Sequence, residues 1–156
     1  MISTKREDDM DFALWILLNV AREFIHDLRE KELNKYGISV RQAGILYAIT
    51  HDLKDYAKPS DIARVNNRKP NSISPLIDRM ERKRLIKKDK DLQKKNVIRI
   101  SLTEEGREAH LMAGNRRSIH RIFSCLTEDE MRQMQFFLNK LIARALEERK
   151  TNILPY

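Results

Sequence analysis

The sequence predicts a mainly α-helical chain with one small β-hairpin, which places it in the α+β class. Only 4 Gly and 4 Pro occur in 156 residues, and such a composition is typical of a helix-rich chain with few turns. Apolar residues recur at helical spacing over most of the chain. Two segments, 85–90 and 96–102, instead have strand character, and their connection is short enough for a hairpin.

The first predicted helix covers residues 9–35, and its apolar residues occupy more than one face. A helix that is apolar around much of its girth must be buried on two sides. In so short a chain, we expect the second side to be covered by another subunit. Gly37 is predicted to stop this helix, and Ser39 is predicted to be the N-cap of a second helix over 40–51.

Two short helices separated by a turn are predicted next. The first covers 58–65 with Pro59 in its first turn, and the second covers 70–83. The second of these helices has apolar residues at helical spacing, and we expect them to face inward. They are Ile73, Leu76, Ile77 and Met80. Pro75 removes one backbone hydrogen bond, so some irregularity is expected near it.

The two strand segments form the predicted hairpin, and two further helices follow. Thr103 is expected to cap a fifth helix that runs to about residue 124. Thr127 and Glu130 have the spacing of a capping box, which predicts a sixth, amphipathic helix through residue 145.

Positive charge is concentrated in one third of the chain. Residues 52–102 hold 15 Lys/Arg and 7 Asp/Glu, a net charge of +8 that equals the charge of the whole chain. A patch this basic favours a polyanionic partner. Because the same segment is predicted to be a helix, a turn, a helix and a basic hairpin, we expect the partner to be double-stranded DNA.

Segment 59–106 contains the run PSDIARVNNRKPNSISPLIDRMERKRLI, a charged hairpin and the run ISLTEEG. This arrangement resembles the MarR family of winged helix-turn-helix transcriptional regulators, and the resemblance extends over residues 10–148 in element order. It implies a homodimer whose terminal helices intertwine on a two-fold symmetric DNA site. It also implies release of the DNA by a small ligand, often an aromatic acid or phenol, or by oxidation.

The resemblance implies a single domain over residues 1–156 with two parts. The helices over 9–35 and 103–149 would form the dimer, and residues 38–102 would form the winged-helix DNA-binding lobe.

The sequence departs from the family pattern at two places. Arg84 stands where the family usually has Gly, and a left-handed conformation there costs about 1 kcal/mol for a residue other than Gly. Arg84 is alternatively a phosphate contact. Lys94 and Asn96 replace the usual Asp-x-Arg pair of the wing, which favours backbone contact by Lys94 and Lys95 over minor-groove reading.

Asn71, Ser72 and Ser74 are the predicted base-reading residues, since Asn can read adenine and Ser can donate or accept. Alternatively, Asn71 or Ser72 only caps its helix. Basic residues of the lobe are the predicted phosphate and wing contacts, namely Arg64, Arg68, Lys69, Arg79, Arg82, Lys90, Lys94 and Lys95. The alternative for each is a solvated charge without a partner.

A small aromatic or phenolic ligand has a candidate pocket around aromatic and polar residues of the first two helices. The predicted lining residues are Trp15, Arg22, His26 and Tyr47, with Phe24 as a further aromatic candidate. Plain core or dimer packing is the alternative for Trp15 and Phe24. Cys125 is interpreted as a small buried hydrophobe, with oxidant sensing as the alternative.

No metal, cofactor or enzymatic activity is expected, because the four His lack ligand spacing and no catalytic constellation stands out. The longest apolar run has seven residues, against about 20 for a membrane span. A single cysteine fits the cytoplasm. The sequence therefore predicts a cytoplasmic, homodimeric, sequence-specific DNA-binding repressor released by a small ligand. The alternative is an architectural protein that binds DNA without reading its sequence.

Overall fold

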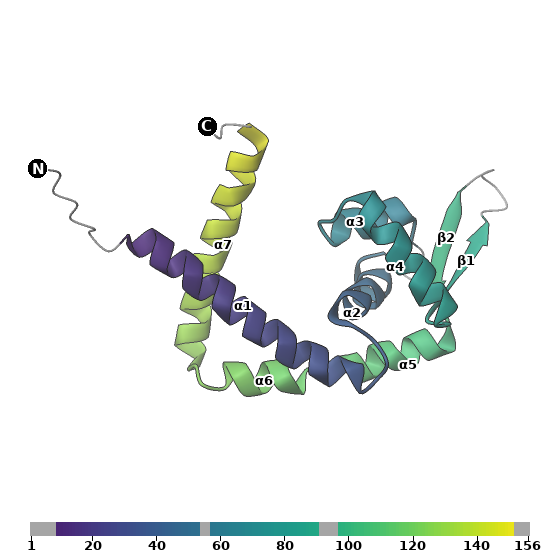
Figure 1. The fold of residues 1–156 in the computed structure, drawn as a ribbon, viewed down its shortest axis with the longest axis horizontal. Coiled ribbons are helices and arrows are strands. Elements are labelled where there is room, and N and C mark those ends of the chain that lie inside the picture. The colour runs from purple at the N-terminus through teal and green to yellow at the C-terminus, as the bar shows by residue number, and fades with distance from the viewer. Residues whose placement is uncertain (1–8, 54–56, 91–96, 152–156) are drawn as a thin grey trace, which may run out of the picture. The chain divides into compact units, whose positions relative to one another are not determined.

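The computed structural model describes residues 9–53, 57–90 and 97–151 (Figure 1). The chain divides into two compact units, Met1–Ser118 and Ile119–Tyr156. The first unit holds five α-helices, a π-helical turn and a two-stranded antiparallel sheet, together with the start of a sixth α-helix. The mainly helical architecture with one hairpin confirms the predicted fold class. Within the described ranges, no helix is long and apolar enough to cross a membrane.

The first helix begins within one residue of its predicted start, and the second begins at its predicted cap, Ser39. Helix α1 spans Met10–Asn34, and Gly37 adopts a φ of 71° in the turn that follows. Helix α2 spans Val40–Tyr47, with a capping box between Ser39 and Gln42. The chain then widens into a π-helical turn, Ala48–Asp52, so the α-helix ends earlier than predicted. The Thr50 hydroxyl donates to the Leu46 carbonyl at 3.0 Å, within the stretch where the hydrogen-bonding pattern changes.

Helices α3 (Pro59–Val65) and α4 (Pro70–Arg82) each begin with a proline, as predicted. Helix α4 continues through Pro75 without interruption, so the expected irregularity is not observed. This proline lies in the second turn, where few backbone bonds depend on it. Helix α4 packs against α3 and the hairpin through its buried residues, which are Ile73, Ile77 and Met80.

The hairpin pairs β1 (Ile86–Lys90) with β2 (Ile98–Leu102), and Ile86 lies opposite Leu102. Ala57 joins the edge of β2 through two backbone hydrogen bonds with Ile100, of 3.0 and 2.8 Å. Helix α5 (Glu104–Ala113) begins directly after β2, and Gly106 lies against the Leu85 carbonyl. A Cβ at position 106 would lie 1.9 Å from that oxygen, so only glycine fits.

The core of the first unit lies where the end of α1 meets α2, α3, α4, α5 and the hairpin. Its largest fully buried side chains come from all of these elements except α5, which contributes two buried alanines, Ala109 and Ala113. The apolar ones are Leu33, Ile38, Ile45, Leu46, Ile49, Ile62, Ile77, Met80, Ile86 and Ile100. Burying one such side chain stabilises a fold by about 1.5–3 kcal/mol, so this cluster fixes α4 and the hairpin in place.

The predicted fifth helix is wrong in one respect, because the chain forms two helices where one was expected. Helix α5 ends at Ala113 and helix α6 spans Arg117–Phe123, with Arg116 at a φ of 46° between them. Gly114 and Asn115 are weak helix formers, but the break is held mainly by two side chains from α1, Arg29 and Glu32.

Arg29 Nη2 donates to the Ala113 carbonyl at 2.6 Å, at the carboxyl end of α5. Glu32 accepts from the backbone N–H groups of Arg117 and Ser118, at 2.8 and 3.1 Å, and from the Ser118 hydroxyl. The two α1 side chains also pair with each other at 2.7 Å. A cation therefore faces one helix end and an anion the other, as the two helix dipoles prefer.

The second unit is dominated by helix α7, Glu128–Thr151. Its predicted capping box is present, because Glu130 N donates to Thr127 Oγ1 at 3.3 Å and Thr127 N donates to the Glu130 carboxylate at 2.7 Å. Large apolar side chains remain exposed along this helix, namely Met131, Met134, Phe136, Phe137, Leu141, Ile142 and Leu146. The apolar stripe predicted for this helix is therefore uncovered in a single chain.

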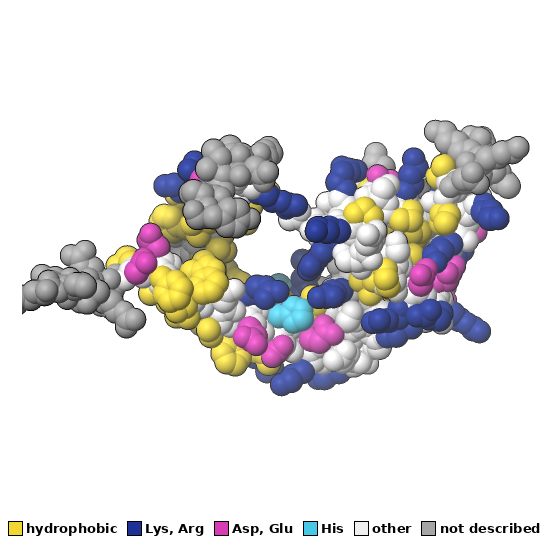
Figure 2. All heavy atoms as spheres, turned by 45° about the horizontal axis from the view of Figure 1, so that its top comes forward, with side chains coloured by type: hydrophobic (Ala, Val, Ile, Leu, Met, Phe, Trp, Pro, Cys, Tyr) yellow, Lys and Arg dark blue, Asp and Glu magenta, His cyan; other side chains and the backbone are white. Residues whose placement is uncertain are grey.

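Helix α1 also keeps most of its apolar residues exposed, with Leu33 as its one buried residue. Leu17 is 63% exposed, Trp15 58% and Phe24 67%. Figure 2 shows hydrophobic side chains gathered over this helix. The apolar surface of α1 is thus largely uncovered within one chain, and its burial by another subunit stays a prediction.

Candidate nucleic-acid interface and pocket

The first turns of α4 present three polar side chains to solvent, Asn71, Ser72 and Ser74. Lys69 is the N-cap residue of this helix, and its side chain makes no capping hydrogen bond. Neither Asn71 nor Ser72 is therefore the N-cap. Asn71 makes no side-chain hydrogen bond to another described residue. Its amide therefore has both a donor and an acceptor available for a partner.

Each of the two serine hydroxyls donates its proton to a backbone carbonyl of the same chain segment. Ser72 Oγ donates to the Lys69 carbonyl at 2.8 Å, and Ser74 Oγ donates to the Pro70 carbonyl at 3.3 Å. A hydroxyl that donates still has acceptor capacity. In this arrangement the serines would accept hydrogen bonds from a partner, whereas Asn71 could form a two-point contact.

Exposed basic side chains surround this helix. Arg79 and Arg82 lie in its last turn, Lys69 precedes it, and Arg68 lies in the turn after α3. Arg64 pairs with Asp61 at 3.7 Å, but the Arg64 side chain is 73% exposed, so this pair is weak and leaves Arg64 available. Figure 2 shows Lys and Arg side chains distributed over this part of the molecule.

The two acidic residues of α4, Asp78 and Glu81, pair with one lysine of the hairpin. Lys88 of β1 pairs with Glu81 at 2.9 Å and also contacts Asp78. The hydrogen bond and charge of Lys88 lower the pKa of Asp78, which stays ionised and paired. Lys88 thus joins the hairpin to α4, and its single positive charge offsets one of the two negative charges of Asp78 and Glu81.

The wing residues are described only in part. Lys90 lies at the exposed end of β1. Lys94, Lys95 and Asn96, on which the wing contacts were predicted, lie outside the described residues.

Arg84, which stands where the family usually has Gly, adopts a left-handed conformation with a φ of 57°. Its N–H donates to Glu81 O at 2.9 Å, and Leu85 N–H donates to Met80 O at 3.0 Å. These two bonds form a Schellman motif, the usual glycine-ended helix terminus. The Thr103 hydroxyl donates to the Arg84 carbonyl and ties this end to the start of α5. The geometry expected of glycine is therefore retained with an arginine.

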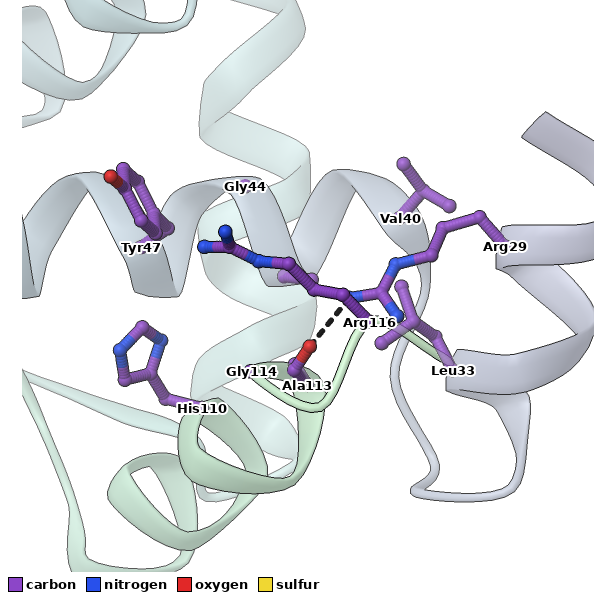
Figure 3. Close-up of a pocket in the computed structure, with 10 residues that line it drawn as sticks. Arg29, Leu33, Val40, Gly44, Tyr47, His110, Ala113, Gly114 and Arg116 are labelled. Carbon is purple, nitrogen blue, oxygen red and sulfur yellow. Dashed lines mark hydrogen bonds between the residues drawn. The ribbon is translucent and has the colours of Figure 1, made fainter. Parts of the chain in front are cut away.

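A cavity of about 200 Å³ lies among α1, α2 and the end of α5 (Figure 3). The lining residues are Arg29, Leu33, Val40, Ala43, Gly44, Tyr47, His110, Ala113, Gly114 and Arg116. Figure 3 shows Tyr47, His110 and the Arg116 guanidinium directed into the same space. The cavity is larger than the roughly 150 Å³ that holds a benzene ring, and its lining mixes apolar and polar side chains.

Aromatic rings form one side of this pocket. Tyr47 and His51 have ring centroids 4.4 Å apart, and His51 and His110 are 5.3 Å apart. The Arg116 guanidinium carbon lies 5.8 Å from the centre of the Tyr47 ring. Burial, together with nearby His51 and Arg116, lowers the pKa of His110. His110 is therefore held in its neutral form near neutral pH.

Of the four predicted pocket residues, only Tyr47 lines this cavity. Trp15 stacks on Phe12 at 5.5 Å in an exposed part of α1, and Arg22 is exposed. His26 lies 4.0 Å from Asp27 and is also exposed. The structure does not bring these three residues to Tyr47.

Sequence reasoning missed Arg29, His110 and Arg116, which supply the other polar groups of the pocket. Their contribution depends on the break between α5 and α6, which local sequence did not indicate.

Cys125 is exposed, so its interpretation as a small buried hydrophobe is wrong for the single chain. In the described part of the chain, no group of three or more His, Cys, Asp or Glu side chains could hold a metal ion.

Known proteins resemble this chain in sequence and structure. The HTH-type transcriptional repressor MdtR of Bacillus subtilis is 32% identical over 127 residues, 79% of this chain and 79% of that protein. The organohalide-sensing transcriptional regulator RdhR, bound to 2,4-dichlorophenol, matches with a TM-score of 0.82 at 25% identity, over 94% of this chain and 90% of that chain. A mutant of Escherichia coli MarR with operator DNA matches with a TM-score of 0.77 at 17% identity, over 85% of this chain and 96% of that chain. No protein-family model matches the chain.

Proposed function

Because the chain belongs to the MarR family of winged helix-turn-helix transcriptional regulators, we propose that it is a sequence-specific double-stranded DNA-binding repressor. It acts as a homodimer on a palindromic operator, and a small ligand releases it. The observation that carries this proposal is the outer face of α4, where an unengaged Asn71 and two serines are surrounded by exposed arginines and lysines.

In this proposal the first turns of α4 enter the major groove, which admits an α-helix. Asn71 reads adenine through its amide, and Ser72 and Ser74 accept hydrogen bonds from exocyclic amino groups. Arginines and lysines around α4 contact phosphates and fix the register, namely Arg64, Arg68, Lys69, Arg79 and Arg82. Lys90, with Lys94 and Lys95 beyond it, supplies the wing contacts.

The homodimer is supported by the uncovered apolar side chains of α1 and α7. Phe24 and Leu17 on α1, and Phe136 on α7, are each more than 60% exposed. Exposed apolar surface of this extent on a single chain is typical of a subunit interface. We assign the helices over 9–35 and 103–149 to the dimer, and residues 38–102 to the DNA-binding lobe. Two α4 helices then read half-sites about 34–36 Å apart.

Ligand release is supported by the pocket beside α2 and α5. Its walls include α2, a helix of the DNA-binding lobe, together with α1 and α5. A ligand alters DNA affinity only if it binds two arrangements of the protein unequally. A neighbour of this chain is a repressor by name and another binds 2,4-dichlorophenol, which supports both parts of the proposal.

The test is selection of bound sequences from a pool of random duplexes at about 150 mM salt, where non-specific phosphate contacts are weakened. We expect a two-fold symmetric motif with half-sites one helical turn apart. Retention of duplexes without any motif, lost steeply as salt rises, would instead identify an architectural DNA-binding protein and contradict the proposal.

A further inference from the structure

A lysine side chain connects the hairpin to α4. Lys88 of β1 lies between two carboxylates of α4, at 2.9 Å from Glu81 and also in contact with Asp78. Its side chain is 24% exposed, whereas that of Lys87 is 60% exposed and pairs with Asp89 of the same strand. Figure 1 shows β1 beside the carboxyl-terminal part of α4. Lys88 thus connects two elements, while the neighbouring Lys87 contacts its own strand.

Lys88 lies at the point where the core stops covering the hairpin. It is opposite Ile100 of β2, which is fully buried. Residues two apart in a strand share a face, so the next pair on this face is Lys90 with Ile98, and both of these residues are exposed. Apolar burial therefore fixes the hairpin up to Ile100, and the direction of Lys90 depends on how β1 is held at Lys88.

The two carboxylates place this connection beside the proposed base-reading face of α4. Asp78 follows Ser74 by four residues and Asn71 by seven, and residues at these spacings lie on one face of a helix. Glu81 is three residues further on, so both carboxylates can reach one ammonium group. The pairing of Lys88 therefore sets the hairpin against the helix face that carries Asn71 and Ser74.

The charge of Lys88 is used within the protein. Its ammonium group faces two carboxylates, and a DNA phosphate would have to compete with both of them. Lys90 is exposed and lies two residues further along the strand. The two lysines therefore differ, because Lys90 can contact a phosphate and Lys88 is held against α4.

We propose that Lys88 is a positioning residue for DNA binding. By pairing with Asp78 and Glu81 it fixes the hairpin against α4, so that Lys90 contacts a phosphate while α4 occupies the major groove. Two elements that are already placed relative to each other bind without a further cost of ordering. Without the pairing, the contact of Lys90 no longer adds to the affinity. This inference deepens the proposed function, and it rests on the proposal that α4 and the hairpin bind DNA.

The test is a double-variant cycle on the full chain, with the duplexes retained from the random pool at about 150 mM salt as the probe. In the unmodified chain, Lys90→Ala should weaken binding at least about twofold and lower the salt slope by about one. In Lys88→Met, Lys90→Ala should change neither. The double variant should therefore bind at least about twofold more tightly than the two single losses combined would give. Lys88→Arg keeps a cation between the carboxylates and should keep the effect of Lys90→Ala.

Lys87→Met is the matched control, because it removes the same charge from the neighbouring position, whose partner lies in β1. In that background Lys90→Ala should keep its full effect. Asp78→Asn combined with Glu81→Gln removes the pairing from the α4 side, so Lys90→Ala should again have no effect. This second route serves if Lys88→Met does not fold. Exposed ion pairs add little stability, so thermal unfolding of both variants should stay within about 4 °C of the unmodified chain.

Three results would overturn the proposal. They are an equal effect of Lys90→Ala in the unmodified chain and in Lys88→Met, no effect of Lys90→Ala in the unmodified chain, and loss of its effect in Lys87→Met. Retained duplexes without a shared motif would contradict sequence-specific binding, and the cycle on those duplexes would still test Lys88. A chain that retains no duplex would overturn both proposals.

Discussion

Glu32 is the residue whose replacement tests the fold of the pocket most sharply. Burial raises the pKa of its carboxyl, but hydrogen bonds from Ser118, Arg29 and Arg117 outweigh burial and lower the pKa from 4.5 to about 2. The two values differ by about 2.5 pH units, and at about 1.4 kcal/mol per unit the ceiling on the stabilisation is about 3 kcal/mol. Glu32→Gln keeps one acceptor oxygen, so we expect a loss of about 2 kcal/mol at pH 7.

The pH dependence of this loss follows from the direction of the shift. A carboxyl whose pKa is lowered by folding contributes its full stability above pH 4.5, and the contribution is lost as the pH falls toward 2. The difference between the unmodified chain and Glu32→Gln should therefore fall to less than half at about pH 3.

The assay is urea denaturation followed by far-UV circular dichroism at both pH values, because it gives the free energy of unfolding directly. Glu23→Gln, at an exposed position on α1, is the matched control and should change stability by less than about 0.5 kcal/mol. A loss for Glu32→Gln that equals the control at pH 7, or that is the same at both pH values, would refute the assignment of Glu32 as the anion that holds the α5–α6 break.

Three further changes give expected outcomes. Arg84→Gly should raise the free energy of unfolding by about 1 kcal/mol, because Arg84 has a φ of 57° in a Schellman motif; an unchanged or lower value in urea denaturation would contradict this. Gly106→Ala should lower it by more than about 3 kcal/mol, because a Cβ would lie 1.9 Å from the Leu85 carbonyl oxygen; a well-folded alanine variant would show that this contact yields. In analytical ultracentrifugation the unmodified chain should sediment as the proposed dimer and Leu17→Glu as a monomer, because Leu17 is 63% exposed on α1; a variant that sediments as a dimer would place the interface elsewhere.

The elements of the lobe were predictable because each has a local signal in the sequence. The prolines at positions 59 and 70 mark the starts of α3 and α4, and the apolar spacing of α4 identifies its buried face. The hairpin was indicated by β-branched residues around a short connection. The caps at Ser39, Thr103 and Thr127 were found for the same reason, since a cap depends on residues only three apart.

The break between α5 and α6 was not predictable from local sequence. It depends on Arg29 and Glu32, which act on residues more than eighty positions away. Gly114 and Asn115 alone are compatible with a continuous, weakened helix. The pocket was missed for the same reason, because Arg29, Tyr47, His110 and Arg116 meet only after this break has formed.

Whether α4 reads DNA sequence is decided by the free-energy difference between binding a selected operator and binding random DNA. Asn71→Ala should reduce this difference by about 1–3 kcal/mol, with the loss confined to one or two base pairs. Arg79→Ala, at a proposed phosphate contact, should weaken binding to both duplexes alike and leave the difference unchanged. If Asn71→Ala instead weakens binding to the operator and to random DNA equally, α4 does not read bases through Asn71.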